Sequence, residues 1–281
     1  MKAIPTALFV GPMKSGTSWI DDYLRYRADI CLPEKVKETF FFDRHYDRGI
    51  DWYKSFFYGY DRNSHRLVAE VAPSLFHVDE SIIRTIRADL GDVPIIVTLR
   101  DPIKRSWSHY LHMRRGYTNK PFQEAIGEFP EILEASFYQD RLSFWRSHFS
   151  KVIVVYQELL TNDERAFMSM IDDHFGLPNI DTEAFQSKNK NQASEPRFFI
   201  VSRLGRHLSR TMRASGLYSV VNVAKQFGLK NLFYGSAKKS NHTKLEIGEA
   251  DAAFLRKKLE SELKTYKQMS GNFVREWTTR S

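Results

Sequence analysis

Short apolar runs alternate with segments of helical periodicity along the first two thirds of this chain. The apolar runs span four or five residues and are rich in Val, Ile and Leu, as in strands buried on both faces. They predict strands near residues 6–10, 67–71, 95–99 and 152–156. The helical patterns predict helices near residues 17–26, 79–89, 102–113, 121–127, 137–148 and 163–174. This alternation predicts an α/β fold, a three-layer sandwich with a central parallel sheet flanked by helices.

The last third of the chain has helical patterns at residues 198–212, 217–227 and 248–268. The last of these repeats apolar residues at helical spacing, which predicts an amphipathic helix. We expect these helices to form a C-terminal cap on the sheet. Since no repeat or low-complexity tract divides the sequence, we expect a single domain over residues 1–281.

The most informative motif follows the first predicted strand and reads Gly-Pro-Met-Lys-Ser-Gly-Thr-Ser over residues 11–18. Gly16 allows backbone angles that other residues resist, and the next residues open a helix whose first amides lack intrahelical partners. A helix start of this kind binds anions. Thr17 and Ser18 add hydroxyl groups, and Lys14 adds a positive charge. The motif therefore predicts a phosphate-binding loop in a P-loop-type fold; the alternative is a tight turn with a solvated lysine.

The position of the lysine separates this loop from that of nucleoside triphosphatases. Their motif places the lysine directly after the second glycine. Here Thr17 follows Gly16, and Lys14 precedes that glycine by two residues. This shift favours transfer of a group other than a phosphoryl group. A nucleotide-dependent phosphotransferase that uses ATP and magnesium remains the alternative, followed by a non-catalytic anion-binding module.

A second motif follows the predicted strand at 95–99. Arg100 stands at its carboxyl end, Asp101 suits a helix N-cap and Pro102 suits the first helical position. Ligands of open parallel sheets bind beyond the carboxyl ends of the strands, so Arg100 and Ser108 could converge on one anion. The alternative is an ion pair between Arg100 and Asp101 or another carboxylate.

Together, the two motifs resemble those of sulfotransferases that use 3′-phosphoadenosine-5′-phosphosulfate (PAPS). Pro-Met-Lys-Ser-Gly-Thr-Ser-Trp resembles their 5′-phosphosulfate loop, and Arg-Asp-Pro with the later Arg, Ser and Tyr resembles their 3′-phosphate site. The resemblance implies transfer of a sulfuryl group to a hydroxyl, with adenosine 3′,5′-bisphosphate (3′,5′-ADP) as product and no required metal. It implies that Lys14 stabilises the leaving phosphate. The implied donor-binding residues are Lys14, Ser15, Gly16, Thr17, Ser18, Trp19, Arg100 and Ser108.

The acceptor side is indicated by residues 34–58, where Glu38 precedes three phenylalanines. An apolar setting raises the pKa of a carboxylate toward the range of a general base. The segment resembles that of the heparan sulfate branch, which implies that Glu38 is the base. Phe41, Asp43 and His45 are the candidate acceptor contacts. A histidine as the base remains open, as does a surface ion pair of Glu38 with a neighbouring lysine.

Two residues depart from the heparan sulfate branch: Val71 stands where that branch has a lysine, and Phe40 stands where it has a histidine. The acceptor motif of the small-molecule branch is also missing. We therefore expect a bacterial-type member whose acceptor is a carbohydrate or a glycosylated small molecule rather than a long sulfated glycan. Cap segments near residues 30–60 and 190–240 would cover the acceptor.

A polar stretch at residues 188–197 resembles the variable loop that closes over the donor nucleotide in this family. Lys190 and Arg197 are its candidate donor-binding residues, and a solvated basic linker is the alternative.

The composition bears on the size of the core, on disulfides and on membrane spans. With 281 residues and 42% hydrophobic residues, the chain can bury one substantial core. A single cysteine, Cys31, excludes an internal disulfide. The first predicted strand begins near the N-terminus and no apolar run is long enough to span a bilayer, so we expect a cytoplasmic protein without a signal peptide.

Charge is unevenly distributed along the chain. The formal net charge is +8, and residues 196–245 contain no Asp or Glu. This basic stretch could attract an anionic acceptor, or a lipid-linked glycan at a membrane surface; a solvated helix face is the alternative. No nucleic-acid-binding module is recognisable, so nucleic acid is not an expected partner. The sequence does not indicate an oligomeric state.

Overall fold

Five parallel strands form the central sheet, in the order β2-β3-β1-β4-β5. The computed structural model describes residues 3–180, 185 and 246–270. Its strands are β1 (Ala7–Val10), β2 (Ile30–Cys31), β3 (Leu67–Val71), β4 (Ile95–Leu99) and β5 (Val152–Tyr156). Every pairing is parallel, and β1 lies between β3 and β4. The predicted α/β sandwich with a parallel sheet is therefore confirmed.

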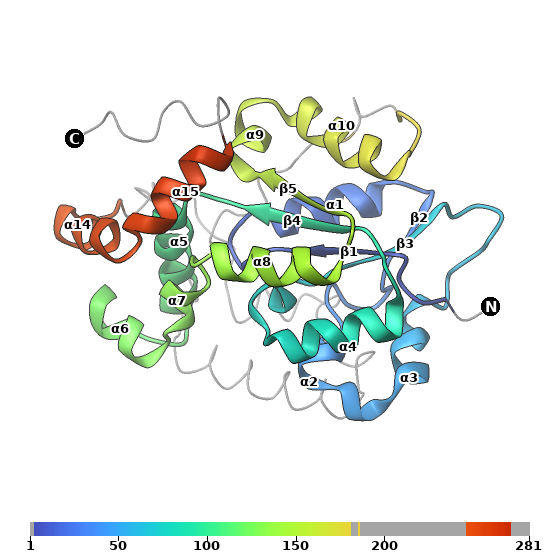
Figure 1. Cartoon of the computed structure of the whole chain (residues 1–281), viewed down its shortest axis with the longest axis horizontal. Helices are drawn as coiled ribbons and strands as arrows, with labels where there is room; N and C mark the ends of the chain where they lie inside the picture. The colour runs from blue at the N-terminus through green and yellow to red at the C-terminus, as the bar shows by residue number, and fades with distance from the viewer. Residues whose placement is uncertain (1–2, 181–184, 186–245, 271–281) are drawn as a thin grey trace, which may run out of the picture.

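Helices cover both faces of the sheet. One face carries α1 (Thr17–Tyr26), α9 (Gln157–Asn162) and α10 (Glu164–Phe175), and the other carries α4 (Glu80–Leu90) and α8 (Gln139–His148) (Figure 1). Successive strand residues point to opposite faces: Leu8 packs in one core cluster and Phe9 in the other. The strand runs are uniformly apolar because both of their faces are buried.

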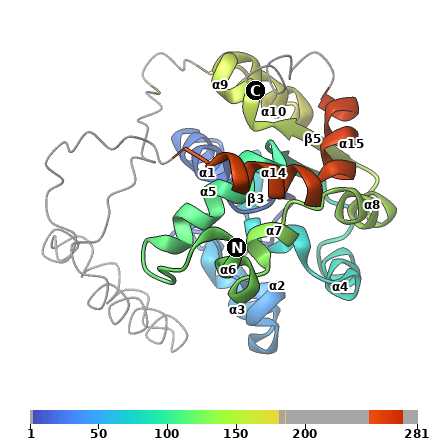
Figure 2. The same cartoon turned by 90° about the vertical axis from the view of Figure 1, so that its left-hand side faces the viewer.

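The carboxyl edge of the sheet is flanked by further helices, which Figure 2 views from that side. These are α5 (Pro102–Arg114), α6 (Phe122–Glu128), α7 (Glu131–Glu134), α14 (Glu249–Lys258) and α15 (Glu260–Ser270). The single helix predicted for residues 248–268 is thus two helices, because Leu259 between them leaves the helical conformation (φ −111°, ψ 18°). Leu259 packs against the core of α5 and α6, which compensates for the break.

Short elements lie between β2 and α4, most of them within residues 34–58, for which the sequence predicted no helix. They are α2 (Phe41–Arg44), η1 (Tyr46–Arg48), α3 (Ile50–Lys54), η2 (Ser55–Phe57) and η3 (Pro73–His77). The predicted helices at 198–212 and 217–227 and the predicted cap segment at 190–240 lie outside the described residues.

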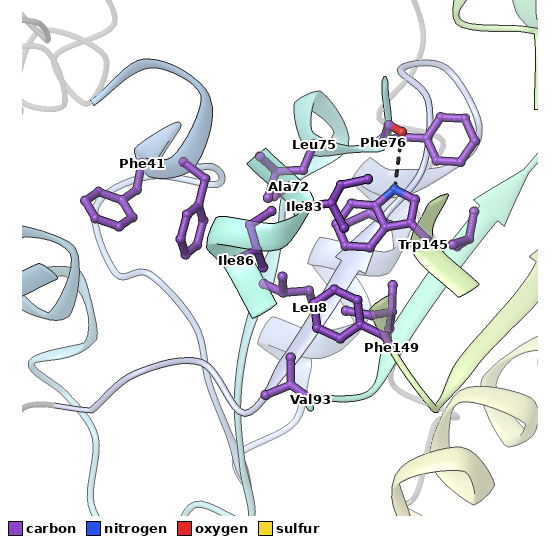
Figure 3. Close-up of a cluster of buried hydrophobic side chains, with 14 of the residues drawn as sticks. Leu8, Phe41, Ala72, Leu75, Phe76, Ile83, Ile86, Val93, Trp145 and Phe149 are labelled. Carbon is purple, nitrogen blue, oxygen red and sulfur yellow. Dashed lines mark hydrogen bonds between the residues drawn. The ribbon is translucent and has the colours of Figure 1, made fainter. Parts of the chain in front are cut away.

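The core on the α4 and α8 face is built around Trp145. Its indole is fully buried, packs among Ile83, Leu8 and Phe149, and donates a hydrogen bond to the Phe76 carbonyl oxygen at 3.3 Å (Figure 3). This side chain therefore links α8 to α4 and to η3, which follows β3.

Replacing Trp145 with alanine is expected to lower the free energy of unfolding by about 3–5 kcal/mol, since it opens a large cavity and leaves a buried carbonyl without its donor. Urea denaturation with matched m-values measures the change. Phe137→Ala is the control, because Phe137 is 37% exposed. A similar loss in both variants would contradict the role of Trp145.

Candidate functional site

The loop between β1 and α1 has a tight backbone that admits few residues at two positions. A Cβ on Gly11 would lie 2.6 Å from the Thr98 carbonyl oxygen, so the loop can pack against β4 only with glycine there. Gly16 has φ +98° and is the N-cap of α1. Lys14 adopts φ +77°, which costs energy for a residue with a Cβ. Such strain is concentrated at functional sites.

The start of α1 supplies the amides of this loop. Its N-cap has no side-chain hydrogen bond, so the first amides of the helix, at Gly16, Thr17 and Ser18, are candidates for binding an anion. Ser15 braces the loop, since its hydroxyl donates to the Pro12 carbonyl oxygen at 2.6 Å.

Trp19 differs from the prediction that its amide holds phosphate. That amide donates to the Gly16 carbonyl oxygen at 3.0 Å, and the indole donates to Glu164 Oε1 at 2.8 Å. The ring also packs against Tyr23 and Phe167. Trp19 therefore fixes α1 on α10 and does not point into the loop.

Arg100 stands at the end of β4, as the sequence predicted, and its side chain extends to this loop. Its Nη1 donates to the Lys14 carbonyl oxygen at 3.2 Å. Within the described part of the chain, its buried Nε has no hydrogen-bond partner. The alternative pairing with Asp101 is not found, because the Asp101 carboxylate accepts the Lys104 amide and caps α5. Arg100 therefore has a buried donor available for an anion.

The second arginine of the motif has a structural role. Arg105 is fully buried; its guanidinium donates to the Ser136 hydroxyl and approaches the Met13 carbonyl oxygen at 3.5 Å. It thereby ties α5 to the phosphate loop. Ser108 lies half-buried one helical turn further along α5. Arg115, the residue that directly follows α5, has a charge that acts on Lys14 of the loop.

Several cations converge on the loop. Burial, together with the charges of Arg115, Arg100 and Lys37, lowers the pKa of Lys14 to about 8. Lys37 Nζ lies 3.4 Å from Thr17 Oγ1 and 3.2 Å from Ser18 Oγ. The sequence analysis did not assign Lys37 or Arg115 to this site, because neither lies in the loop motif.

Glu38 directly follows Lys37, and its charge acts on that lysine. Its Oε1 accepts the Ser74 amide at 2.8 Å. The pKa of Glu38 is raised to about 7, mainly by burial. The hydrogen bonds from Ser74 oppose this shift, and the charges of Glu70 and Asp43 contribute to it. The alternative of a surface ion pair does not fit: Lys35 lies over the Tyr58 ring, and Lys37 donates to the loop hydroxyls.

Glu70 supports the segment that carries Glu38. It is buried on β3, and its carboxylate accepts the Thr39 amide and the Tyr53 hydroxyl, each at 2.6 Å. Burial raises the pKa of Glu70. The sequence analysis did not single out Glu70, although a lone carboxylate within the apolar run of a buried strand was a usable signal.

The predicted acceptor residues occupy different environments. Phe41 is 1% exposed and stacks on Tyr53 at 4.5 Å, so its ring belongs to the core, and the prediction that it contacts the acceptor does not fit. Asp43 accepts the Arg44 Nε at 3.2 Å through Oδ2, while its buried Oδ1 has no partner among the described residues. His45 packs edge-on to Trp52 at 5.5 Å.

His77, at the end of η3, is a candidate that the sequence analysis missed. Its Nδ1 is buried and has no hydrogen-bond partner in the described ranges. Burial lowers the pKa of His77, and the charges of Arg105 and Arg141 lower it further.

The two residues that depart from the heparan sulfate branch have the following environments. Phe40 has φ +55° and lies under the Arg44 guanidinium, and Val71 is fully buried.

Lys190 and Arg197 lie outside the described residues, so their predicted roles stay predictions. Over residues 3–180, 185 and 246–270, no group of three or more His, Cys, Asp or Glu side chains is arranged to hold a metal ion. None of the described helices has the length and apolar character needed to cross a membrane.

Comparison with known proteins agrees with this geometry. Heparan sulfate glucosamine 3-O-sulfotransferase 3B1 of Homo sapiens is 28% identical over 204 residues, which cover 68% of this chain and 51% of that protein. Heparan sulfate glucosamine 3-O-sulfotransferase 6 of Homo sapiens is 29% identical over 194 residues, covering 65% and 55%. The chain thus spans about half the length of these curated relatives.

A solved sulfotransferase structure from Alicyclobacillus acidocaldarius has the same fold. It aligns with a TM-score of 0.57 and 22% identity, covering 66% of this chain and 88% of that one. The family model described as the sulfotransferase domain matches residues 5–197, more than half of the chain. The resemblance noted from the two motifs is therefore confirmed, and this chain belongs to the sulfotransferase domain family.

Proposed function

We propose that this protein transfers a sulfuryl group from PAPS to a hydroxyl of a carbohydrate or of a glycosylated small molecule. One observation carries the proposal: Glu38, a carboxylate with a pKa of about 7, directly follows Lys37, which donates to the hydroxyls of a phosphate loop on which several cations converge. The Glu38 carboxylate is suited to remove a proton, and the cations of the loop are suited to hold a polyanionic donor.

The residues present fit a donor with phosphates at two positions. The start of α1, with the Thr17 and Ser18 hydroxyls, suits the 5′-phosphate. Arg100 has a buried Nε without a partner in the described part of the chain, and it is the candidate for the 3′-phosphate, together with Ser108. The bound donor would supply the sulfuryl group.

The proposed reaction is an in-line displacement. A bond forms between the acceptor oxygen and sulfur, and the bond between sulfur and the bridging oxygen of the donor breaks. Glu38 takes the proton of the acceptor hydroxyl, and Lys14 stabilises the negative charge on the leaving phosphate. The products are a sulfate ester and adenosine 3′,5′-bisphosphate. As in phosphoryl transfer, positioning and charge stabilisation carry the catalysis.

The choice of a carbohydrate acceptor is supported by the curated relatives, which are named for action on heparan sulfate glucosamine. We propose that three polar side chains near Glu38 or in its segment contact acceptor hydroxyls: Asp43, His45 and His77. The differences at Phe40 and Val71 support an acceptor other than heparan sulfate itself.

Calorimetric titration with adenosine 3′,5′-bisphosphate in EDTA tests the proposal, beside ADP and ATP with magnesium. We expect tight binding of the bisphosphate and weak binding of ADP and ATP, since only the bisphosphate carries the 3′-phosphate. A preference for ATP with magnesium would contradict sulfuryl transfer and favour a phosphotransferase. Tight binding of the bisphosphate justifies a screen of sugar acceptors with PAPS.

The pH profile of kcat/KM is expected to be a narrow bell. Glu38 must be ionised to act as a base, so activity falls as the pH drops below about 7. Lys14 must be protonated to stabilise the leaving group, so activity also falls as the pH rises above about 8. In kcat the upper limb moves to higher pH, because an anionic donor raises the pKa of Lys14. Activity that stays constant while the pH falls through 7 would contradict the role of Glu38.

A further inference from the structure

Lys37 reaches the phosphate loop from a segment that carries no part of the loop motif. Its Nζ donates to Ser18 Oγ at 3.2 Å and to Thr17 Oγ1 at 3.4 Å, across about twenty positions of sequence. These hydroxyls stand at the start of α1, where the helix favours an anion. The ammonium group therefore lies beside the 5′ end of the proposed donor site.

The segment is held in place on both sides of Lys37. Before it, Arg25 of α1 donates to the Pro33 carbonyl oxygen at 3.1 Å and to the Val36 carbonyl oxygen at 3.0 Å. After it, the Thr39 amide donates to buried Glu70 at 2.6 Å. A lysine on such a braced segment loses little additional freedom when it binds a ligand.

Charges of both signs act on Lys37 and on the loop that it contacts. Lys37 is among the cations that lower the pKa of Lys14, so its charge acts at the centre of the loop. Burial lowers the pKa of Lys37, while the charges of Asp21 and Glu38 oppose that shift. Asp21 is itself paired with Arg25 at 3.1 Å. A cluster of like charges in a half-buried loop is costly until an anion neutralises it.

We propose that Lys37 is a second donor-binding lysine, which contacts the 5′-phosphate end of PAPS while Arg100 contacts its 3′-phosphate. This assignment rests on the proposed function. Lys37 directly precedes Glu38 in the sequence. The bound phosphosulfate would therefore lie between the Lys37 cation and the general base. A lysine that only bridges the segment to α1 is the competing interpretation.

Nucleotide selectivity separates these interpretations. We would titrate the wild type and the variants Lys37→Met, Lys37→Gln, Arg100→Ala and Lys35→Ala with three ligands: adenosine 3′,5′-bisphosphate, adenosine 5′-monophosphate and adenosine 3′-monophosphate. Lys37→Met is expected to weaken binding of the 3′,5′-bisphosphate and of the 5′-monophosphate about tenfold to a hundredfold, since a hydrogen bond to a charged group is lost. Its affinity for the 3′-monophosphate should stay unchanged. Arg100→Ala should instead spare the 5′-monophosphate.

Two variants serve as controls. Lys37→Gln can still donate to the loop hydroxyls but carries no charge, so it should bind as weakly as Lys37→Met, and it also serves if the methionine variant does not fold. Lys35→Ala removes an exposed lysine of the same segment, whose ammonium group lies over the Tyr58 ring, and should bind all three ligands normally.

The possible failures are distinguishable. Wild-type protein that does not bind the bisphosphate would overturn the proposed function and this assignment with it. Two outcomes with tight wild-type binding would overturn the assignment of Lys37 alone. One is an unchanged affinity in Lys37→Met or Lys37→Gln, and the other is an equal loss of affinity for all three ligands.

Discussion

Lys14→Ala is expected to lower kcat about 10²–10³-fold with a sugar acceptor from the screen, because a preorganised charge beside the leaving group is lost. Lys14 holds its amine in a half-buried site at the centre of the cation cluster. Its backbone, at φ +77°, is strained for alanine as well as for lysine, so the substitution removes the charge without relaxing the loop. Steady-state release of adenosine 3′,5′-bisphosphate measures the effect.

Two further substitutions at this position separate charge from backbone. Lys14→Gly relieves the strain and lacks the amine, so it should be as inactive as Lys14→Ala. Lys14→Arg retains a positive charge and should keep part of the activity. If Lys14→Ala turned over within about threefold of the wild type, the assignment of Lys14 to the leaving group would be wrong, since one such donor normally contributes far more.

Glu38→Gln should lower kcat about 10²–10⁴-fold while the affinity for adenosine 3′,5′-bisphosphate stays within about twofold, because a general base acts on the acceptor and not on the donor. The amide can still accept the Ser74 N–H through its oxygen, so the segment should keep its conformation. The pairing of lost turnover with unchanged donor binding is the diagnostic result. It requires both a kinetic assay and calorimetry.

Glu34→Gln is the matched control, since Glu34 lies in the same segment but is exposed. It should keep wild-type turnover. Full activity of Glu38→Gln with a cognate acceptor would instead direct attention to His77 or His45 as the base. His109 is a poor candidate, since burial lowers its pKa to about 3 and its Nδ1 lies 3.2 Å from Arg105.

The regular elements were predictable because their signals are local. The strands at 67–71, 95–99 and 152–156 have the predicted bounds, and the helices of the described N-terminal part begin and end within two residues of prediction. Periodicity needs several turns or a run of apolar residues, so short elements such as α2, α7 and α9 gave no usable signal. Leu259 divides the helix that was predicted for residues 248–268, and its packing is likewise not a local property.

The sequence alone also determined that the phosphate loop and Arg100 each follow the carboxyl end of a parallel strand. Both follow parallel strands that lie side by side, and the carboxyl ends of such strands share one edge of the sheet. Their contact at 3.2 Å follows from that topology. The strand order, which places β1 beside β4, was decided only by the tertiary structure, because no local pattern sets which strands are neighbours.

Only the tertiary structure decided the environment of Glu38 and the place of Lys37. Glu38 binds the amide of Ser74, and Lys37 binds the hydroxyls of α1; both partners are distant in sequence. The sequence led us to expect a raised pKa at Glu38, but the size of the shift, to about 7, depends on burial in the folded chain. The same holds for Phe41, whose ring was expected at the site and instead fills the core, since local motifs do not fix which way a side chain packs.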